Sequence, residues 1–158
     1  MTALASKPLA TRDLVVTRVI NAPADLVFRM WTDPTHMAKW WGPHGFTNPV
    51  CEMDVRPGGA MRIDMIGPDG ATCPMVGTFQ EVVAGKRLVF MAIAQDPDGN
   101  PLLESLTTVT FEDLGGKTRL TVDARAVGIS PLAPPRLECM ETGWTQSLER
   151  LDAWVAQQ

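Results

Sequence analysis

Two histidines and one glutamate are the side chains of this sequence best suited to transfer protons. Histidine is the side chain type suited to proton transfer at neutral pH. The chain has two, His36 and His44, and His44 directly follows the Trp-Trp-Gly-Pro segment at 40–43. Glu141 lies three residues before Trp144, at the border of an apolar stripe. General acid or base chemistry needs such a group beside an apolar site. A solvated surface position is the more ordinary interpretation of each residue, and the sequence leaves both open.

Three cysteines are the candidate nucleophiles. Cys51, Cys73 and Cys139 are far apart and odd in number, which fits neither a disulfide framework nor a zinc site. A catalytic cysteine needs a nearby histidine or a cationic helix end, and the spacing places neither beside one of them. We therefore expect ordinary buried or half-buried thiols in a reducing compartment, with no metal and no cofactor.

A polar cluster at 54–59 has two interpretations. Arg56 is a candidate for binding a carboxylate at the rim of a site. The alternative is a turn between strands, in which Asp54 and Arg56 pair or cap backbone amides and Gly58 and Gly59 supply the bend. The turn is favoured, and a phosphate loop is excluded because no Lys-Ser or Lys-Thr pair follows the glycines.

Three of the five tryptophans, Trp31, Trp40 and Trp41, fall within eleven residues of one another. Burying one indole removes about 150–250 Å² from water. At about 25 cal/mol per Å², this burial contributes up to roughly 4–6 kcal/mol per ring. The segment that carries the three rings must therefore face an apolar interior. Trp31 is expected to pack structurally.

The first third of the chain predicts a strand followed by a helical hairpin. β-Branched residues indicate a strand over 14–20, which ends before Pro23. One helix follows and stops at Asp33-Pro34, and a second helix stops at Gly42-Pro43.

The remainder predicts strands and then a helix. From Phe46 onward, alternating apolar and polar residues separated by Gly, Pro and Asp turns indicate a meander of about six antiparallel strands. After Pro134-Pro135, apolar residues at three- and four-residue spacing predict one long amphipathic helix. The order indicates an α+β fold, with a curved antiparallel sheet of about six to seven strands around the final helix. Residues 1–12 read as a flexible leader and 13–158 as a single domain.

Composition excludes two classes of partner. A net charge of −4 argues against a nucleic-acid-binding surface. The longest apolar run, 88–94, has seven residues and is too short to span a membrane. Because the N-terminus also lacks the apolar core of a signal peptide, we expect a cytoplasmic protein. Exposed strand edges would permit a homodimer.

Five motifs in one consistent order resemble a known superfamily. They are Arg18-Val19-Ile20-Asn21-Ala22-Pro23, Trp31-Thr32-Asp33-Pro34, Trp40-Trp41-Gly42-Pro43, Asp54-Val55-Arg56-Pro57-Gly58-Gly59 and Gly143-Trp144-Thr145-Gln146-Ser147-Leu148. The chain resembles the START-like, or SRPBCC, superfamily, in the bacterial branch named for the C-terminal domain of activators of heat-shock-protein ATPase. The resemblance implies a helix-grip fold with a deep apolar cavity between the sheet and the last helix.

The resemblance gives three functional hypotheses, of which the first two use this cavity and the third comes from the name of the branch alone. The favoured one is a binding or carrier protein for a small hydrophobic metabolite, lipid-like or polyketide-like. The second is a cyclase-like or hydrolase-like enzyme with His44 or Glu141 as proton carrier, and the third is a chaperone ATPase-activator module. Plain core packing is the alternative role for each methionine among the expected ligand-binding residues. These residues are Trp40, Trp41, His44, Met61, Ile63, Met65, Met75, Phe79, Phe90, Met140, Glu141 and Trp144.

Overall fold

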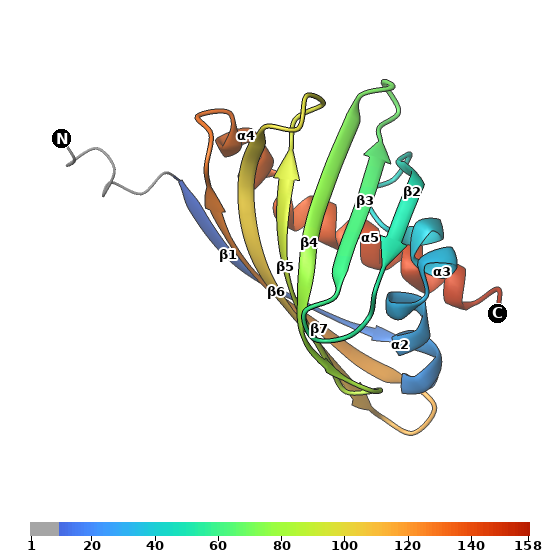
Figure 1. Cartoon of the computed structure of the whole chain (residues 1–158). Coiled ribbons are helices and arrows are strands. Elements are labelled where there is room, and N and C mark those ends of the chain that lie inside the picture. The colour runs from blue at the N-terminus through green and yellow to red at the C-terminus, as the bar shows by residue number, and fades with distance from the viewer. Residues whose placement is uncertain (1–9) are drawn as a thin grey trace.

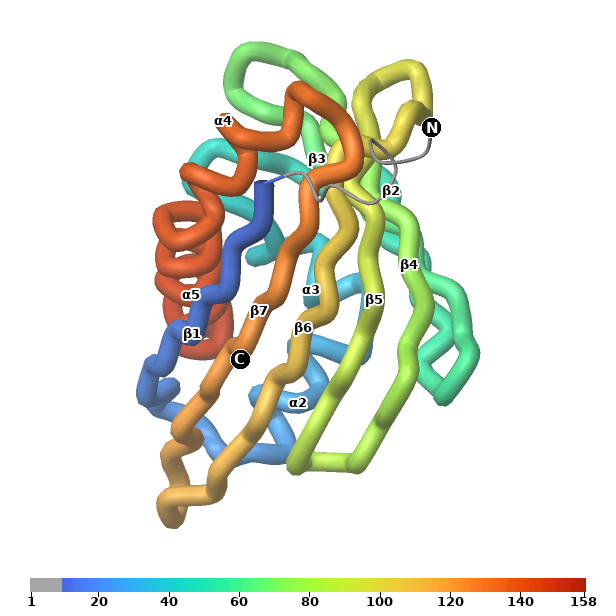
Figure 2. The backbone as a smooth tube through the Cα atoms, turned by 90° about the vertical axis from the view of Figure 1, so that its left-hand side faces the viewer, coloured from blue at the N-terminus to red at the C-terminus, as the bar shows by residue number. Residues whose placement is uncertain are grey.

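The structure is a computed structural model that describes residues 10–158. Within this range the chain forms one seven-stranded antiparallel sheet, in the order β1-β7-β6-β5-β4-β3-β2, and four helices. The elements are β1 (Thr11–Ile20), α2 (Ala24–Thr32), α3 (Pro34–Trp40), β2 (Thr47–Met53), β3 (Ala60–Ile66), β4 (Thr72–Val83), β5 (Arg87–Gln95), β6 (Pro101–Asp113), β7 (Thr118–Gly128), α4 (Ala133–Glu138) and α5 (Met140–Val155). Figures 1 and 2 show α2, α3 and α5 on the same side of the curved sheet. The α+β class, the curved antiparallel sheet and the helical hairpin after the first strand are confirmed.

The first strand is longer than the sequence predicted. β1 pairs with β7 from Thr11, opposite Val127, to Ile20, opposite Thr118. Thr11 and Arg12 therefore belong to the sheet and not to a leader; the first nine residues of the expected leader lie outside the described residues. The segment Thr11-Arg12-Asp13 lacks apolar alternation, which is why periodicity did not include it.

Asp33 joins the two helices of the hairpin. It ends α2, and its Oδ1 accepts a hydrogen bond of 2.9 Å from the Thr35 amide at the start of α3. Pro34 occupies the first helical position, where no amide hydrogen is needed. Trp31 is fully buried, with its ring centroid 4.7 Å from that of Trp40. The hairpin therefore packs its tryptophans inward, as their combined surface requires.

The C-terminal segment forms two helices where the sequence predicted one. Cys139 lies between α4 and α5 with φ −89° and ψ −1°. This backbone conformation belongs to the sparsely populated bridge region, so the helix is interrupted there. The apolar stripe of α5 is present, because Leu148, Leu151 and Val155 are buried. The break makes α4 a separate element and changes where its side chains lie.

The inner face of the sheet, which meets the helices, carries large side chains at one end. Leu88, Val109 and Val122 form one cross-strand row, and Phe111 pairs with Leu120 in the next. All five are at most 4% exposed. We call these five residues the packed end. Phe28 of α2 lies over it, with ring centroids 5.2 Å from Phe111, so helix and sheet meet closely here.

Candidate functional site

Small side chains replace large ones further along the same three strands. Ala92, Ser105 and Ala126 form one cross-strand row, and Thr107 pairs with Ala124 in a neighbouring row. Together with Ala94, these residues line a pocket of about 470 Å³ between the sheet and the C-terminal helices. We call the six residues the small-residue floor. Ala126 clusters with Ala133 and Leu137 of α4, so α4 covers one end of the floor, and the pocket lies over the rest.

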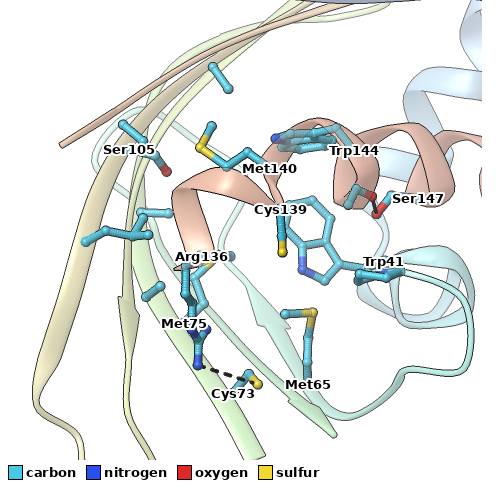
Figure 3. Close-up of a pocket in the computed structure, with 18 of the residues that line it drawn as sticks. Trp41, Met65, Cys73, Met75, Ser105, Arg136, Cys139, Met140, Trp144 and Ser147 are labelled. Carbon is cyan, nitrogen blue, oxygen red and sulfur yellow. Dashed lines mark hydrogen bonds between the residues drawn. The ribbon is translucent and has the colours of Figure 1, made fainter. Parts of the chain in front are cut away.

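Aromatic and thioether side chains form the walls of the pocket. Trp144 and Met140 come from α5, Trp41 follows α3, and Met65 and Met75 come from β3 and β4. The Trp144 ring stacks on Trp31 at 6.1 Å between centroids, with 18° between the planes, and meets Trp41 edge-on at 5.4 Å. Figure 3 shows the methionines and tryptophans around one space. Flexible thioethers beside rigid rings suit an apolar ligand whose shape the wall must follow.

The chain between α3 and β2 is fixed to α5 beside the pocket. Arg150 Nη1 donates to the carbonyl oxygens of Trp41, Gly42 and Pro43 at 2.9, 2.9 and 3.0 Å. Burial lowers the pKa of the Arg150 guanidinium below its ordinary value. Gly42 has φ +95°, and a Cβ there would lie 2.9 Å from Met65 Sδ. Glycine is therefore required where this segment lines the pocket.

One edge of the pocket combines two thiols and a cation. Cys73 of β4, Cys139 at the helix break and Arg136 of α4 all contribute to the lining. Arg136 Nη2 lies 3.8 Å from Cys73 Sγ, the contact drawn as a dashed line in Figure 3. Sulfur is a weak acceptor, so this contact uses little of the hydrogen-bonding capacity of the guanidinium.

The structure brings together half of the predicted ligand-binding residues. The pocket lining includes Trp41, Met65, Met75, Phe90, Met140 and Trp144. Four others, Trp40, Met61, Ile63 and Phe79, lie in the hydrophobic core and are at most 3% exposed. Trp40 Nε1 donates to the Met30 carbonyl at 3.0 Å, which fixes its ring away from the pocket.

The two predicted proton carriers lie outside the pocket lining. His44 is exposed, with Nε2 3.0 Å from Glu149 Oε1, and its backbone amide donates to Gln146. Glu141 is also exposed and pairs with Arg12 at 3.3 Å. Neither group is placed to exchange a proton with a molecule in the pocket.

The remaining polar candidates are structural. Arg56 Nε donates to Asp54 Oδ2 at 2.7 Å on an exposed turn, which supports the turn interpretation of segment 54–59. Cys51 packs against the core, and burial raises the pKa of its thiol to about 11, with a smaller contribution from Asp33 and Glu52. A thiol with so high a pKa is a poor nucleophile. Cys139 is exposed, unlike the buried or half-buried thiols that were expected.

Sequence reasoning missed the small-residue floor and Arg136. The predicted site residues were mostly bulky apolar side chains, whereas a hollow also needs small residues opposite them. Two signals were available: Ala92 and Ala94 alternate, as do Ala124 and Ala126. Arg136 was hidden because the predicted helix ran through Cys139 without a break.

Within residues 10–158, no group of three His, Cys, Asp or Glu side chains is placed to hold a metal ion. No helix in this part of the chain is long and apolar enough to cross a membrane.

Comparison with known proteins supports the family resemblance that the five sequence motifs indicated. The family described as "Activator of Hsp90 ATPase homolog 1-like protein" matches residues 21–156. A crystal structure of a protein from Chromobacterium violaceum is 32% identical with TM-score 0.78, covering 90% of this chain and 96% of that one. An uncharacterized protein from Rhizobium leguminosarum is 26% identical with TM-score 0.80, covering 94% and 97%. Among proteins with curated functions, none matches this chain.

Proposed function

Because the chain belongs to the family of Activator of Hsp90 ATPase homolog 1-like proteins, a START-like fold compatible with ligand binding, we propose that it binds or carries a small apolar molecule. The site is the pocket over the small-residue floor. The observation that carries the proposal is the pocket of about 470 Å³ that this floor leaves beneath α5. This volume falls in the range of small-molecule sites, about 300–1,000 Å³.

The pocket is partly open to solvent, so either water or a ligand fills it. Water finds few hydrogen-bonding partners among alanine, methionine and tryptophan side chains. An apolar ligand therefore satisfies this lining better than water does.

The positions of His44 and Glu141 favour a carrier over an enzyme. His44 and Glu141 are engaged on the surface with Glu149 and Arg12, so we assign neither a catalytic role. The family name is what suggested chaperone activation, and no contact or surface in residues 10–158 adds to that suggestion. We place the carrier in the cytoplasm, in keeping with the composition of the chain.

The test is a fluorescence titration with N-phenyl-1-naphthylamine, a neutral apolar dye. We expect the unaltered protein to bind it with increased emission. Ala126→Phe fills the floor and should weaken binding at least about tenfold, since the ring occupies the space of the dye. Ala153→Phe, at an exposed position of α5, is the matched control and should bind normally.

If Ala126→Phe fails to fold by circular dichroism, Ser105→Leu replaces it, because Ser105 is half-buried on the same floor. Dye binding that is equal in the unaltered protein and in the folded floor variants would overturn the proposal.

A further inference from the structure

We propose that the ligand of this pocket is a monoanion, an apolar organic acid whose carboxylate binds Arg136 while its apolar body lies over the small-residue floor. This inference rests on the proposed function and specifies the chemical class of the ligand. Within the described residues, Arg136 is the single charged side chain among those that line the pocket.

Arg136 differs from eight of the other nine arginines in its partners; the ninth, Arg29, is exposed and lies outside the pocket lining. Seven arginines pair with carboxylates: Arg12, Arg18, Arg56, Arg62, Arg87, Arg119 and Arg125. Arg150 is satisfied by backbone carbonyls. Arg136 has only the Cys73 thiol at 3.8 Å within residues 10–158. Most of its five N–H donors are thus free for a ligand.

The position of Arg136 fits one end of an elongated ligand. Figure 3 shows its guanidinium beside Cys73 and Met75, at the edge of the pocket, with Trp144 and Met140 on α5. The side chain is half-buried, so water weakens a bound ion pair less than on an open surface. A carboxylate at Arg136 would leave its apolar body facing the floor and the aromatic wall.

The floor also carries a hydroxyl group. Thr107 is 2% exposed and lines the pocket. Its hydroxyl can donate to or accept from a polar atom of a ligand.

The charges on the pocket lining limit which class of ligand it can bind. No carboxylate lines the pocket within residues 10–158, so an amine would meet Arg136 without an acidic partner. A dianionic phosphate would keep one charge uncompensated beside an apolar wall, whereas a carboxylate is neutralised by one guanidinium and matches its planar fork. The net charge of −4 gives the protein no general attraction for anions, so any preference for an acid must arise locally.

The experiment compares decanoate with decan-1-ol, which share a chain and differ in charge, by titration calorimetry. A second arm uses 1-naphthoate and 1-naphthalenemethanol to separate straight-chain from aromatic acids. The measured quantity is the ratio of the acid and alcohol Kd values, because loss of folded protein affects both equally. We expect Arg136→Gln to weaken acid binding about tenfold or more and to change alcohol binding less than about twofold. Arg136→Lys should retain part of the preference.

Arg29→Gln is the matched control, since Arg29 is exposed and outside the pocket lining. It removes the same charge and should leave the ratio unchanged. If Arg136→Gln binds both acids as the unaltered protein does while the alcohols still bind, the proposed anion site is wrong and the apolar carrier stands. If neither acids, alcohols nor N-phenyl-1-naphthylamine bind, both proposals fall.

Discussion

The packed end and the small-residue floor belong to the same strands, yet they have opposite relations to the helices. On β6, Val109 and Phe111 are buried, with Phe111 against Phe28 of α2, whereas Ser105 and Thr107 line the pocket. Backbone pairing continues in one register through both regions. The difference therefore lies in side-chain volume: the same curved surface supports a solid core or a hollow according to which residues occupy the inward positions.

The packed end therefore contributes mainly to the stability of the fold, and the small-residue floor is available for binding. Large side chains at the packed end bury apolar surface beneath the hairpin, whereas the floor meets the helices mainly through the small cluster of Ala126 with α4. The floor is then available for a ligand without loss of the core. Relatives with the same architecture can differ at the floor residues and keep the fold, which is why the fold alone does not name a ligand.

The largest expected effect comes from removing bulk at the packed end. Phe111→Ala should reduce the free energy of unfolding by about 3–5 kcal/mol, because it creates a cavity among Phe28, Trp31 and the neighbouring strands. Urea denaturation followed by circular dichroism measures the loss. Thr110→Ala, on an exposed position of the same strand, is the control and should change stability by less than about 0.5 kcal/mol. A Phe111→Ala loss as small as the control would contradict the distinction between the two ends.

Cysteine reactivity compares the hydrophobic core, against which Cys51 packs, with the pocket, which Cys73 lines. Raising the pKa of Cys51 from 9.0 to about 11 lowers its thiolate fraction at pH 8 about 100-fold. In a chain that keeps Cys51 and carries Cys73→Ser and Cys139→Ser, iodoacetamide should therefore react about 100-fold faster in urea than in the folded state. The folded rate should rise as the pH approaches 11, because the thiolate forms there. Mass spectrometry gives the rates.

The complementary chain keeps Cys73 on the pocket lining and replaces Cys51 and Cys139 by serine. Its folded rate at pH 8 should exceed that of the Cys51 chain. Equal rates for Cys51 in the folded and unfolded states would show that its surroundings do not exclude water.

Overpacking should be costly where the inner face is already full. Val109→Phe adds a ring at a core position that is 0% exposed, and we expect the free energy of unfolding to fall by about 1–3 kcal/mol. Chemical denaturation is the measurement. An unchanged unfolding midpoint would mean that the packed end contains unoccupied space.

The sequence predicted the architecture because the signals for it are local. Alternation within each strand, Gly and Pro at the turns and Asp33-Pro34 between the helices all act over a few residues, and each corresponds to an observed element. The ends of elements were less certain: Thr11 and Arg12 extend β1 without apolar alternation, and the break at Cys139 has no proline or glycine to mark it.

The candidate site could be predicted only in part, because a hollow depends on register. Trp41, Met65 and Trp144 were expected as walls since each lies on an apolar face. That Ala92, Ser105 and Ala126 form a continuous row depends on pairing between residues 13 and 21 positions apart, which periodicity within a strand does not give.

The smallest expected effect is the most informative for the comparison. Ser105→Val places a branched side chain on the small-residue floor, on the same strand and face as Val109. Because the pocket has room for the added methyl groups, and the Ser105 hydroxyl donates no hydrogen bond within the described residues, stability should change by less than about 1 kcal/mol, in either direction. Denaturation under the conditions used for Val109→Phe provides a direct comparison. A loss as large as that of Val109→Phe would mean that the floor is packed as tightly as the other end, and the distinction between the two regions would no longer hold.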